Sequence, residues 1–367
     1  MVLCVEISHF KSIRKVRLDL ARVTVLIGPP GSGKSNIMEG LALLGFPYRL
    51  LRDIGAKLYE KPENISPFKE IARFDDVKDL FYFGEIKNPV TLRVRCEKTG
   101  LEGSIKLMFS RGELTVTPST QLLKTLVDVL TSRVDDFAYG SEDSWILDSW
   151  LYGYDRFGLA KSIPGHLRLP YRKHPLYLLA EDGSNIAYVL TQYRGVVQEI
   201  NELFEDMHID IEVKVLRDGR VVIFDHDYEI PYVTLSEGFG RLLYYLSALH
   251  GLENYVKAFN LEDKLVALFE EPGAHIFPYA LQVLVNRIKE LSLDAYVIIS
   301  THNPLLASLI ADKVQDFALY YIYRDPKKHD TRATYCSIER LAEEFVTIED
   351  LVLSVERAGE ICQRESE

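Results

Sequence analysis

The 367-residue chain has little cysteine and no long apolar run. Its cysteines form no CxxC pair, so we expect neither a disulfide framework nor a zinc site, and a reducing cytoplasm is the simplest location. They are Cys4, Cys96, Cys336 and Cys362. No apolar run approaches the roughly 18 residues needed to cross a bilayer, and the N-terminus lacks a signal-peptide layout. We therefore expect a cytoplasmic protein with no membrane partner.

Positive charge is also in short supply. Lys and Arg number 43 against 54 Asp and Glu, and the net charge of −11 argues against a uniformly basic surface that coats nucleic acid. The net charge does not exclude a local basic surface or contact between that surface and DNA. Two groups could form it: Arg49, Arg52 and Lys57 on the first helical segment, and Arg324, Lys327, Lys328, His329 and Arg332 near the C-terminus. A solvated surface explains either group equally well.

Residues 28–35 read GPPGSGKS between an apolar strand, 23–27, and a helical pattern over 36–44. Glycines in such a loop let backbone N–H groups turn toward phosphate oxygens, and the helix that follows adds the positive end of its dipole. The lysine reaches the β- and γ-phosphates and the serine ligates Mg²⁺. We therefore predict that ATP or GTP binds, with Mg²⁺, to Gly28, Pro29, Pro30, Gly31, Ser32, Gly33, Lys34, Ser35 and Asn36.

Alternating helix and strand patterns fill the chain after residue 235. Strands are expected over 265–269, 295–300 and 317–323, and helices over 238–250, 278–291 and 304–311, before a helical tail. Repeated βα units imply a parallel sheet with helices on its faces. The chain thus predicts an α/β fold, with a nucleotide-binding core formed by 1–60 and 230–367.

The remaining segment, 61–229, has a different character. Within it, 90–117 contain three short β runs separated by turns, which favours an antiparallel subdomain. Outside it, apolar and polar residues alternate over 1–20 in a pattern typical of a β-hairpin. Two further β runs occupy 211–224. Helical periodicity is visible over 34–59, 119–133 and 184–207, whereas the aromatic stretch 136–173 has no clear pattern. We expect 61–229 to form an inserted β subdomain and helical lobe.

Two predicted strands end in polar side chains. The strand LVALF is followed by Glu270 and Glu271, which predicts a metal-side acid and a general base for the water that attacks the γ-phosphate. The next parallel strand ends at His302, which could donate a hydrogen bond to the γ-phosphate or to that water. Solvated strand ends are common, but the phosphate loop upstream favours the catalytic interpretation of Glu271 and His302.

The segment TLSEGFG, residues 234–240, opens a predicted helix. Ser236, Gly238 and the helix N-terminus could form a second anion site, although Ser and Gly are also ordinary helix caps. The order of the four motifs carries more information than any one of them: phosphate loop, LSxG, strand plus two glutamates, then STH.

That order resembles the ABC-type ATPase head of the RecF/SMC-related branch, and most of all the OLD-family (AAA-21/AAA-15) ATPases. The similarity includes FKSI at 10–13, GPPGSGKSNIMEGL at 28–41, DGSNIAYVL at 182–190, IPYVTLSEGFGRLLYYLSAL at 230–249 and LFEEPGAHIFP at 268–278. It implies an ABC-ATPase-like head with a mixed or parallel sheet, an antiparallel β subdomain and a helical insertion. It also implies a homodimer in which Ser236 and Gly238 of one subunit meet the γ-phosphate held by Lys34 of the other.

The sequence departs from this family in two places. A Gln loop usually follows the first helix and contacts Mg²⁺, yet no Gln precedes Gln121, so Asn64, Glu70, Asp75 or water would have to substitute. OLD nucleases carry a C-terminal nuclease domain, but here the tail is short. Its acids resemble a solvated helix face more than a metal cluster: Glu339, Glu343, Glu344, Glu349 and Asp350.

The leading interpretation is a Mg²⁺-dependent ATPase that acts as a dimerisation switch, in DNA repair, DNA maintenance or defence, with a separate effector protein. A nucleotide-gated scaffold that hardly hydrolyses ATP is the first alternative. The energising subunit of a transporter is the second, which the missing Gln loop disfavours.

Overall fold

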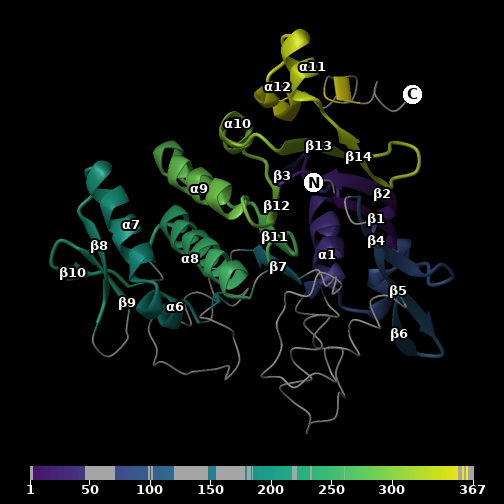
Figure 1. The fold of residues 1–367 in the computed structure, drawn as a ribbon, viewed down its shortest axis with the longest axis horizontal. Helices are drawn as coiled ribbons and strands as arrows, with labels where there is room; N and C mark the ends of the chain where they lie inside the picture. Colours follow the sequence, from purple (N-terminus) through teal and green to yellow (C-terminus); the bar gives the residue numbers. More distant parts are fainter. Residues whose placement is uncertain are drawn as a thin grey trace, which may run out of the picture.

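A six-stranded, mostly parallel sheet runs through the centre of the computed structural model (Figure 1). Its strand order is β14-β13-β3-β12-β11-β7, and β14 alone is antiparallel to its neighbour. The strands are β3 (Val23–Ile27), β7 (Asp148–Gly153), β11 (Leu265–Glu270), β12 (Tyr296–Ser300), β13 (Phe317–Arg324) and β14 (Thr331–Tyr335). The structure describes residues 3–45, 71–97, 100, 102–119, 148–153, 178–179, 183, 185–216, 221–231, 234–259, 261–353, 358 and 361–362.

Helices cover both faces of this sheet, as Figure 1 shows. Alternate residues of β11 point to opposite sides: Leu265, Ala267 and Phe269 pack into one hydrophobic core, Val266 and Leu268 into the other. The first core includes α8 (Glu237–Phe259), α9 (Pro278–Leu291) and α10 (Pro304–Lys313), and the second includes α1 (Lys34–Leu44). Burial on both faces explains why these strands are continuously apolar in sequence. The parallel α/β sheet and its expected strands and helices are confirmed.

A five-stranded antiparallel sheet lies on the α1 side. Its order is β2-β1-β4-β5-β6, formed by β1 (Leu3–Phe10), β2 (Ile13–Leu20), β4 (Val90–Cys96), β5 (Glu102–Ser110) and β6 (Glu113–Pro118). The expected hairpin and three β runs are thus confirmed. Because β4 pairs with β1 and β7 pairs with β11, two strands from 61–229 complete sheets of the other segments. The division into 1–60 plus 230–367 and 61–229 stays a prediction.

A smaller layer packs beyond α8 and α9. It contains α6 (Ile186–Gln192), α7 (Arg194–Asp206) and a sheet ordered β10-β9-β8, from β8 (Ile211–Val215), β9 (Val221–Asp225) and β10 (Tyr228–Glu229). The remaining short helices are η1 (Val77–Leu80), η2 (Tyr82–Gly84), α11 (Ile338–Glu343) and α12 (Ile348–Leu353). Within the described ranges, no helix combines the length and apolarity needed to span a membrane.

Some expected helices lie partly or wholly outside the described residues, and the observed strands β7 and β14 were not expected. Helix α1 ends at Leu44, and the expected continuation to 59 lies outside the described residues, as does most of the helix expected over 119–133. The unassigned stretch 136–173 supplies edge strand β7 but is otherwise outside them. Strand β14 was not anticipated, because its sequence TRATY lacks an apolar alternation and its partner β13 is what makes it a strand.

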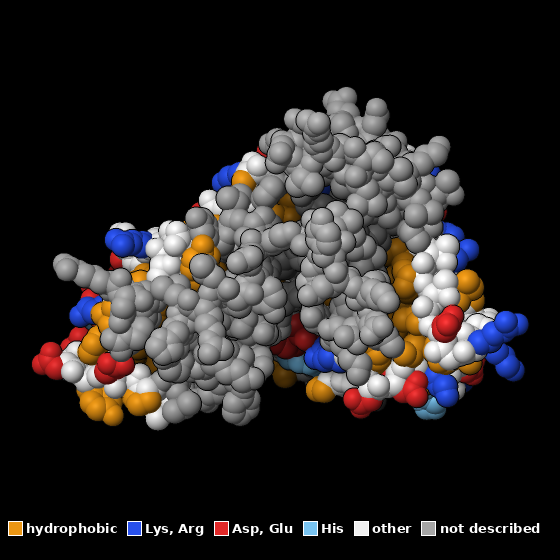
Figure 2. Space-filling view, turned by 90° about the horizontal axis from the view of Figure 1, so that it is seen from below, with side chains coloured by type: hydrophobic (Ala, Val, Ile, Leu, Met, Phe, Trp, Pro, Cys, Tyr) orange, Lys and Arg blue, Asp and Glu red, His pale blue; other side chains and the backbone are white. Residues whose placement is uncertain are grey.

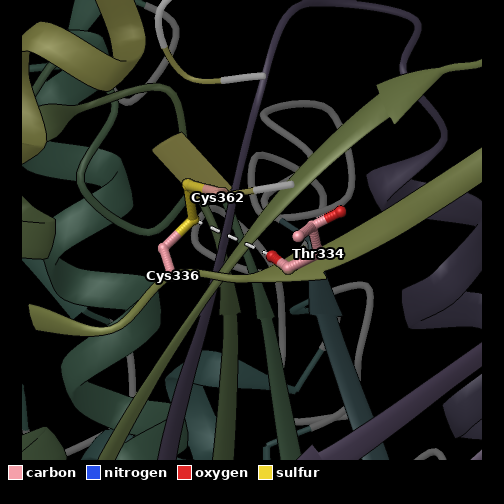
Figure 3. The surroundings of a disulfide bond; sticks show 3 residues. All are labelled: Thr334, Cys336 and Cys362. Carbon is pink, nitrogen blue, oxygen red and sulfur yellow. Dashed lines mark hydrogen bonds between the residues drawn. A yellow bond between two sulfur atoms is a disulfide. The ribbon is translucent and has the colours of Figure 1, made fainter. Parts of the chain in front are cut away.

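The expectation of no disulfide is wrong. Cys336, just after β14, is bonded to Cys362 near the C-terminus, with their Cα atoms 4.8 Å apart (Figure 3). Both side chains belong to the first hydrophobic core, and Cys336 Sγ also lies 3.8 Å from the Thr334 carbonyl oxygen. The 26-residue separation along the chain gave no sign of this pairing, because α11 and α12 intervene between the two cysteines.

Truncating Phe269 should destabilise the whole fold. Its ring is 1% exposed and stacks on Tyr152 with centroids 5.6 Å apart, so Phe269→Ala should lower the free energy of unfolding by about 3–5 kcal/mol. Phe345, which is 92% exposed, provides the control: Phe345→Ala should change it by no more than about 0.5 kcal/mol. Urea unfolding measures both, and equal losses would contradict the core described here.

Candidate functional site

The register of β12 brings three sequence motifs to one edge of the central sheet. Ser300, its last residue, lies opposite Leu26 of β3 on one side and Glu270 of β11 on the other. The glycine loop that follows β3, the two glutamates at the end of β11 and the STH segment after β12 therefore meet at the carboxyl edge. In open parallel sheets this edge is where ligands bind.

Two glycines of the loop are required by close backbone approaches. Gly28 has φ 146°, and a Cβ there would lie 2.0 Å from the Ile322 carbonyl oxygen of β13. Gly33 has φ 105°, and its Cβ would lie 2.1 Å from Thr331 Oγ1 of β14. The glycine loop therefore packs directly against β13 and β14.

A hydrogen-bond chain supports the loop from behind. Buried Thr331 donates from Oγ1 to the Ser32 carbonyl at 3.0 Å, and its hydroxyl lies 2.7 Å from that of Ser12. Asn36 donates to Ser12 Oγ at 2.6 Å, so this predicted nucleotide-binding residue here braces the loop. Arg324 donates to the Gly31 carbonyl at 3.0 Å. Sequence reasoning missed Thr331 and Ser12 in this role, since no local pattern marks them.

The loop and the start of α1 have the features of an anion site. No side chain caps the first turn of α1, which leaves its N–H groups for an anion. Ser32 Oγ is buried and has no hydrogen-bond partner among the described residues, which is costly unless a ligand supplies one. A triphosphate fits this donor set.

Lys34 points back into the loop. Its Nζ donates to the carbonyl oxygens of Gly28 at 2.8 Å and Pro29 at 3.2 Å, and lies 3.1 Å from His302 Nε2. Burial lowers the pKa of Lys34 to about 8, and the charges of Glu271 and Glu270 oppose that shift. An ammonium only donates, so His302 Nε2 is the acceptor and the ring proton sits on Nδ1. Burial, followed by the Lys34 charge, lowers the pKa of His302, which favours this neutral form.

Ser35 and Glu270 together fit a magnesium ion. Ser35 Oγ donates to Glu270 Oε1, so a hydroxyl and a carboxylate lie side by side where the loop meets β11. Hard oxygen ligands of this kind are what Mg²⁺ prefers, and it usually keeps several waters besides. Tyr245 donates its hydroxyl to the Glu270 carbonyl at 2.6 Å and fixes the end of the strand.

Glu271 is held in a strained backbone conformation. Its φ is 50°, in the left-handed region, which costs about 1–3 kcal/mol for a residue with a side chain. Two hydrogen bonds retain it: Glu271 N–H donates to the Ser300 carbonyl at 2.9 Å, and Glu271 Oε2 accepts the His302 N–H at 3.0 Å. Burial raises the pKa of Glu271, against the opposing effects of His302 N–H and Lys34, so its carboxylate is more basic than usual. A base of that kind is suited to accept a proton.

An ion-pair cluster that the sequence did not predict lies next to Ser35 and Glu270. Arg73 Nη2 lies 3.1 and 3.2 Å from the two oxygens of Glu270, and Arg73 Nε donates to Glu39 at 2.8 Å. Lys11 pairs with the other Glu39 oxygen. Of the substitutes suggested for the Gln loop, Asn64 and Glu70 lie outside the described residues. Asp75 is exposed and its N–H donates to Asp79, whereas Arg73 contacts Glu270.

The LSEGFG segment forms the start of α8, as expected. Ser236 is exposed, and its Oγ accepts the Phe239 N–H at 3.4 Å as a helix cap. Gly238 packs so closely on the loop after β11 that a Cβ would lie 2.1 Å from the His275 carbonyl oxygen. Arg241, one turn further, donates to the Glu271 carbonyl at 3.4 Å. The second anion site at Ser236 and Gly238 stays a prediction.

Several charged residues singled out in the sequence have local structural partners. Arg324 also donates to the His329 carbonyl, Arg332 pairs with buried Asp330, and the N–H groups of Lys327 and Lys328 bond Asp325. Near the C-terminus, Glu339, Glu349 and Asp350 accept hydrogen bonds from Ser337, Ser308 and Thr347.

Among the described residues, Lys and Arg side chains form no single continuous patch on the face drawn in Figure 2. There, Lys and Arg side chains are scattered among acidic and apolar ones across the described part of the chain. Arg49, Arg52 and Lys57, the other suggested DNA contacts, lie outside the described residues.

Comparisons with known proteins identify a family and a fold. The family model described as "AAA domain, putative AbiEii toxin, Type IV TA system" matches residues 56–308, a range that holds the LSEGFG, EE and STH motifs and follows the glycine loop. No curated protein matches the chain.

Solved structures share the fold. An SmcHead bound to the C-winged helix domain of ScpA is 16% identical, covers 93% of this chain and 99% of its own, and has a TM-score of 0.52. An Smc head domain with an extended coiled coil, bound to the C-terminal domain of ScpA and derived from Pyrococcus furiosus, is also 16% identical. It covers 94% of this chain and 98% of its own, with a TM-score of 0.50. The fold is that of an ABC/SMC-like P-loop ATPase head.

Nucleotide binding should weaken at alkaline pH. Free Lys34 loses its proton as the pH rises through about 8, and a bound phosphate must restore that proton before the pair forms. The Kd for ATP should therefore rise above pH 8 by up to about tenfold per pH unit. In Lys34→Arg, whose guanidinium stays charged, the Kd for ATP should change less with pH than in the wild type. A wild-type Kd that is constant from pH 7 to pH 9, measured with a fluorescent ATP analogue, would contradict this assignment.

Proposed function

Because the chain belongs to the family of AAA domains described as putative AbiEii toxin, Type IV TA system, we propose that it is a Mg²⁺-dependent ATPase whose nucleotide sites are completed when two copies of the chain close around ATP. The observation that carries this proposal is the meeting of Lys34, Ser35, Glu270, Glu271 and His302 at one sheet edge.

Each of these residues has a distinct role in the proposed reaction. Lys34 exchanges the Gly28 and Pro29 carbonyls for phosphate oxygens. Ser35 and Glu270 hold Mg²⁺, which supplies positive charge to the phosphate oxygens when bound. Glu271 takes a proton from the attacking water. Neutral His302 lies beside Lys34, where it would contact the γ-phosphate and act as its sensor.

The exposed start of α8 supports a role for a second copy. Ser236 lies at the surface, where a γ-phosphate held by another subunit could reach it and the N–H groups of the first turn of α8. In a two-fold dimer the same pair of surfaces meets twice, so two nucleotides would be enclosed. We propose that ATP binding closes this homodimer and that hydrolysis reopens it.

We base a proposal for the biological setting on this switch and on the resemblance to OLD-family ATPases. We propose an ATPase head that acts in DNA repair, DNA maintenance or defence through a separate effector protein. Protein partners are supported by the two SMC heads described above, whose structures were determined in complex with ScpA domains. The raised basicity of Glu271 favours this ATPase over a scaffold that hardly hydrolyses ATP.

Glu271→Gln should retain ATP binding but slow hydrolysis about 100-fold or more, because the amide cannot accept the proton of the attacking water. Phosphate release measures turnover, and a fluorescent ATP analogue measures binding. Glu344→Gln, an exposed change after α11, is the control and should keep the wild-type rate. Wild-type turnover in Glu271→Gln would show that this residue is not the base.

Ser236→Arg should prevent ATP from closing the dimer. The large cation would stand where the partner's nucleotide and Mg²⁺ must approach, and it would repel the metal. Light scattering of Glu271→Gln with ATP should show a mass close to two chains, and addition of Ser236→Arg to this variant should return it to one. Ser110→Arg, at the exposed end of β5, is the matched control. A dimer that survives Ser236→Arg would exclude α8 from the interface.

A further inference from the structure

Arg73 binds both oxygens of the carboxylate that is assigned to the metal. Its Nη2 lies 3.1 Å from Oε1 and 3.2 Å from Oε2 of Glu270, and Oε1 also accepts the Ser35 hydroxyl. The lone pairs that would face a metal ion are therefore directed at a guanidinium and a hydroxyl. A cation already neutralises Glu270 from within the chain.

Glu39 anchors this cation from the other side. The Glu39 side chain is 2% exposed and accepts from both Arg73 Nε and Lys11 Nζ. A buried carboxylate needs such partners, and Lys11 alone would leave it paired if Arg73 moved. Arg73 itself is 64% exposed on its side chain, so its guanidinium can leave Glu270 for water at small cost.

The backbone of Arg73 has its own anchor. Lys11 Nζ donates to the Arg73 carbonyl at 2.7 Å, and Lys11 N–H donates to the Leu80 carbonyl at 3.2 Å. Phe83 N–H returns to the Lys11 carbonyl at 2.9 Å. Movement of the Arg73 side chain thus needs no rearrangement of the segment from Arg73 to Phe83.

From these contacts we infer that Arg73 is an exchangeable internal cation that competes with Mg²⁺ for Glu270. This rests on the proposed function, in which Ser35 and Glu270 hold the metal. Two cations within a few ångströms of one another repel, so the guanidinium must swing away as the ion enters. Arg73 therefore raises the Mg²⁺ concentration that nucleotide binding requires. Until the metal binds, Arg73 balances the negative charge of Glu270.

The test compares how much Mg²⁺ each variant needs. A fluorescent ATP analogue is held at a fixed concentration while Mg²⁺ is titrated, and the half-saturating Mg²⁺ concentration is recorded. In Arg73→Gln it should fall about two- to fivefold, the size of one partly exposed ion pair. Arg73→Lys, which keeps the charge, should stay close to wild type. Arg93→Gln removes a half-exposed arginine paired with Glu6 and Glu102 on the antiparallel sheet, and should change nothing.

A second readout follows the metal itself. Electron paramagnetic resonance of free Mn²⁺, with ADP present, should show tighter Mn²⁺ binding by Arg73→Gln than by wild type. An unchanged or higher metal requirement in Arg73→Gln, with unfolding temperatures showing that the variant is folded, would overturn the inference. Failure of the proposed function is distinct: there, wild-type protein itself would bind the analogue without any dependence on Mg²⁺.

Discussion

The parallel pairing of β12 with both β3 and β11 is the constraint on which the rest of the site depends. Because Ser300 lies opposite Leu26 and Glu270, the segments that follow all three strands leave the sheet at one level. The loop of Lys34, the carboxylates of Glu270 and Glu271 and the ring of His302 then meet without any long connection. A slip of β12 by one residue would reverse its buried faces, so the cores that hold α8 and α1 also hold this alignment.

Charge balance is the second feature that organises the site. Buried Lys34 lies among Glu270, Glu271 and His302, and the lowered pKa values of Lys34 and His302 and the raised pKa of Glu271 share burial as their first cause. Groups of this kind are stable only with partners, and here the partners are loop carbonyls, a backbone N–H and Arg73. A nucleotide with its metal ion would replace several of these contacts at once. Binding therefore amounts to an exchange of partners.

Sequence patterns predicted the elements whose own residues determine them. The strands after residue 235 are buried on both faces and the helices between them have an apolar side, so β11 to β13 were predicted with small errors at their ends, whereas α8 runs nine residues past its expected end at 250. The fold class and the edge of the sheet followed from them, and the P-loop followed from the GPPGSGKS motif at 28–35. Features that depend on a distant segment were not predicted: β14 and its Thr331, the Cys336–Cys362 bond, and Arg73 on Glu270. Local periodicity holds no information on such pairings.

The central claim is that one nucleotide site is completed by a second copy of the chain. It is tested most directly by mixing two inactive variants, Glu271→Gln and Ser236→Arg. In a mixed dimer, the Ser236→Arg chain supplies an intact Lys34, Ser35 and Glu271, and the Glu271→Gln chain supplies an intact Ser236 and Gly238 across the interface. The account predicts that the mixture hydrolyses ATP faster than the sum of the two variants assayed alone. A mixture no more active than that sum would contradict it.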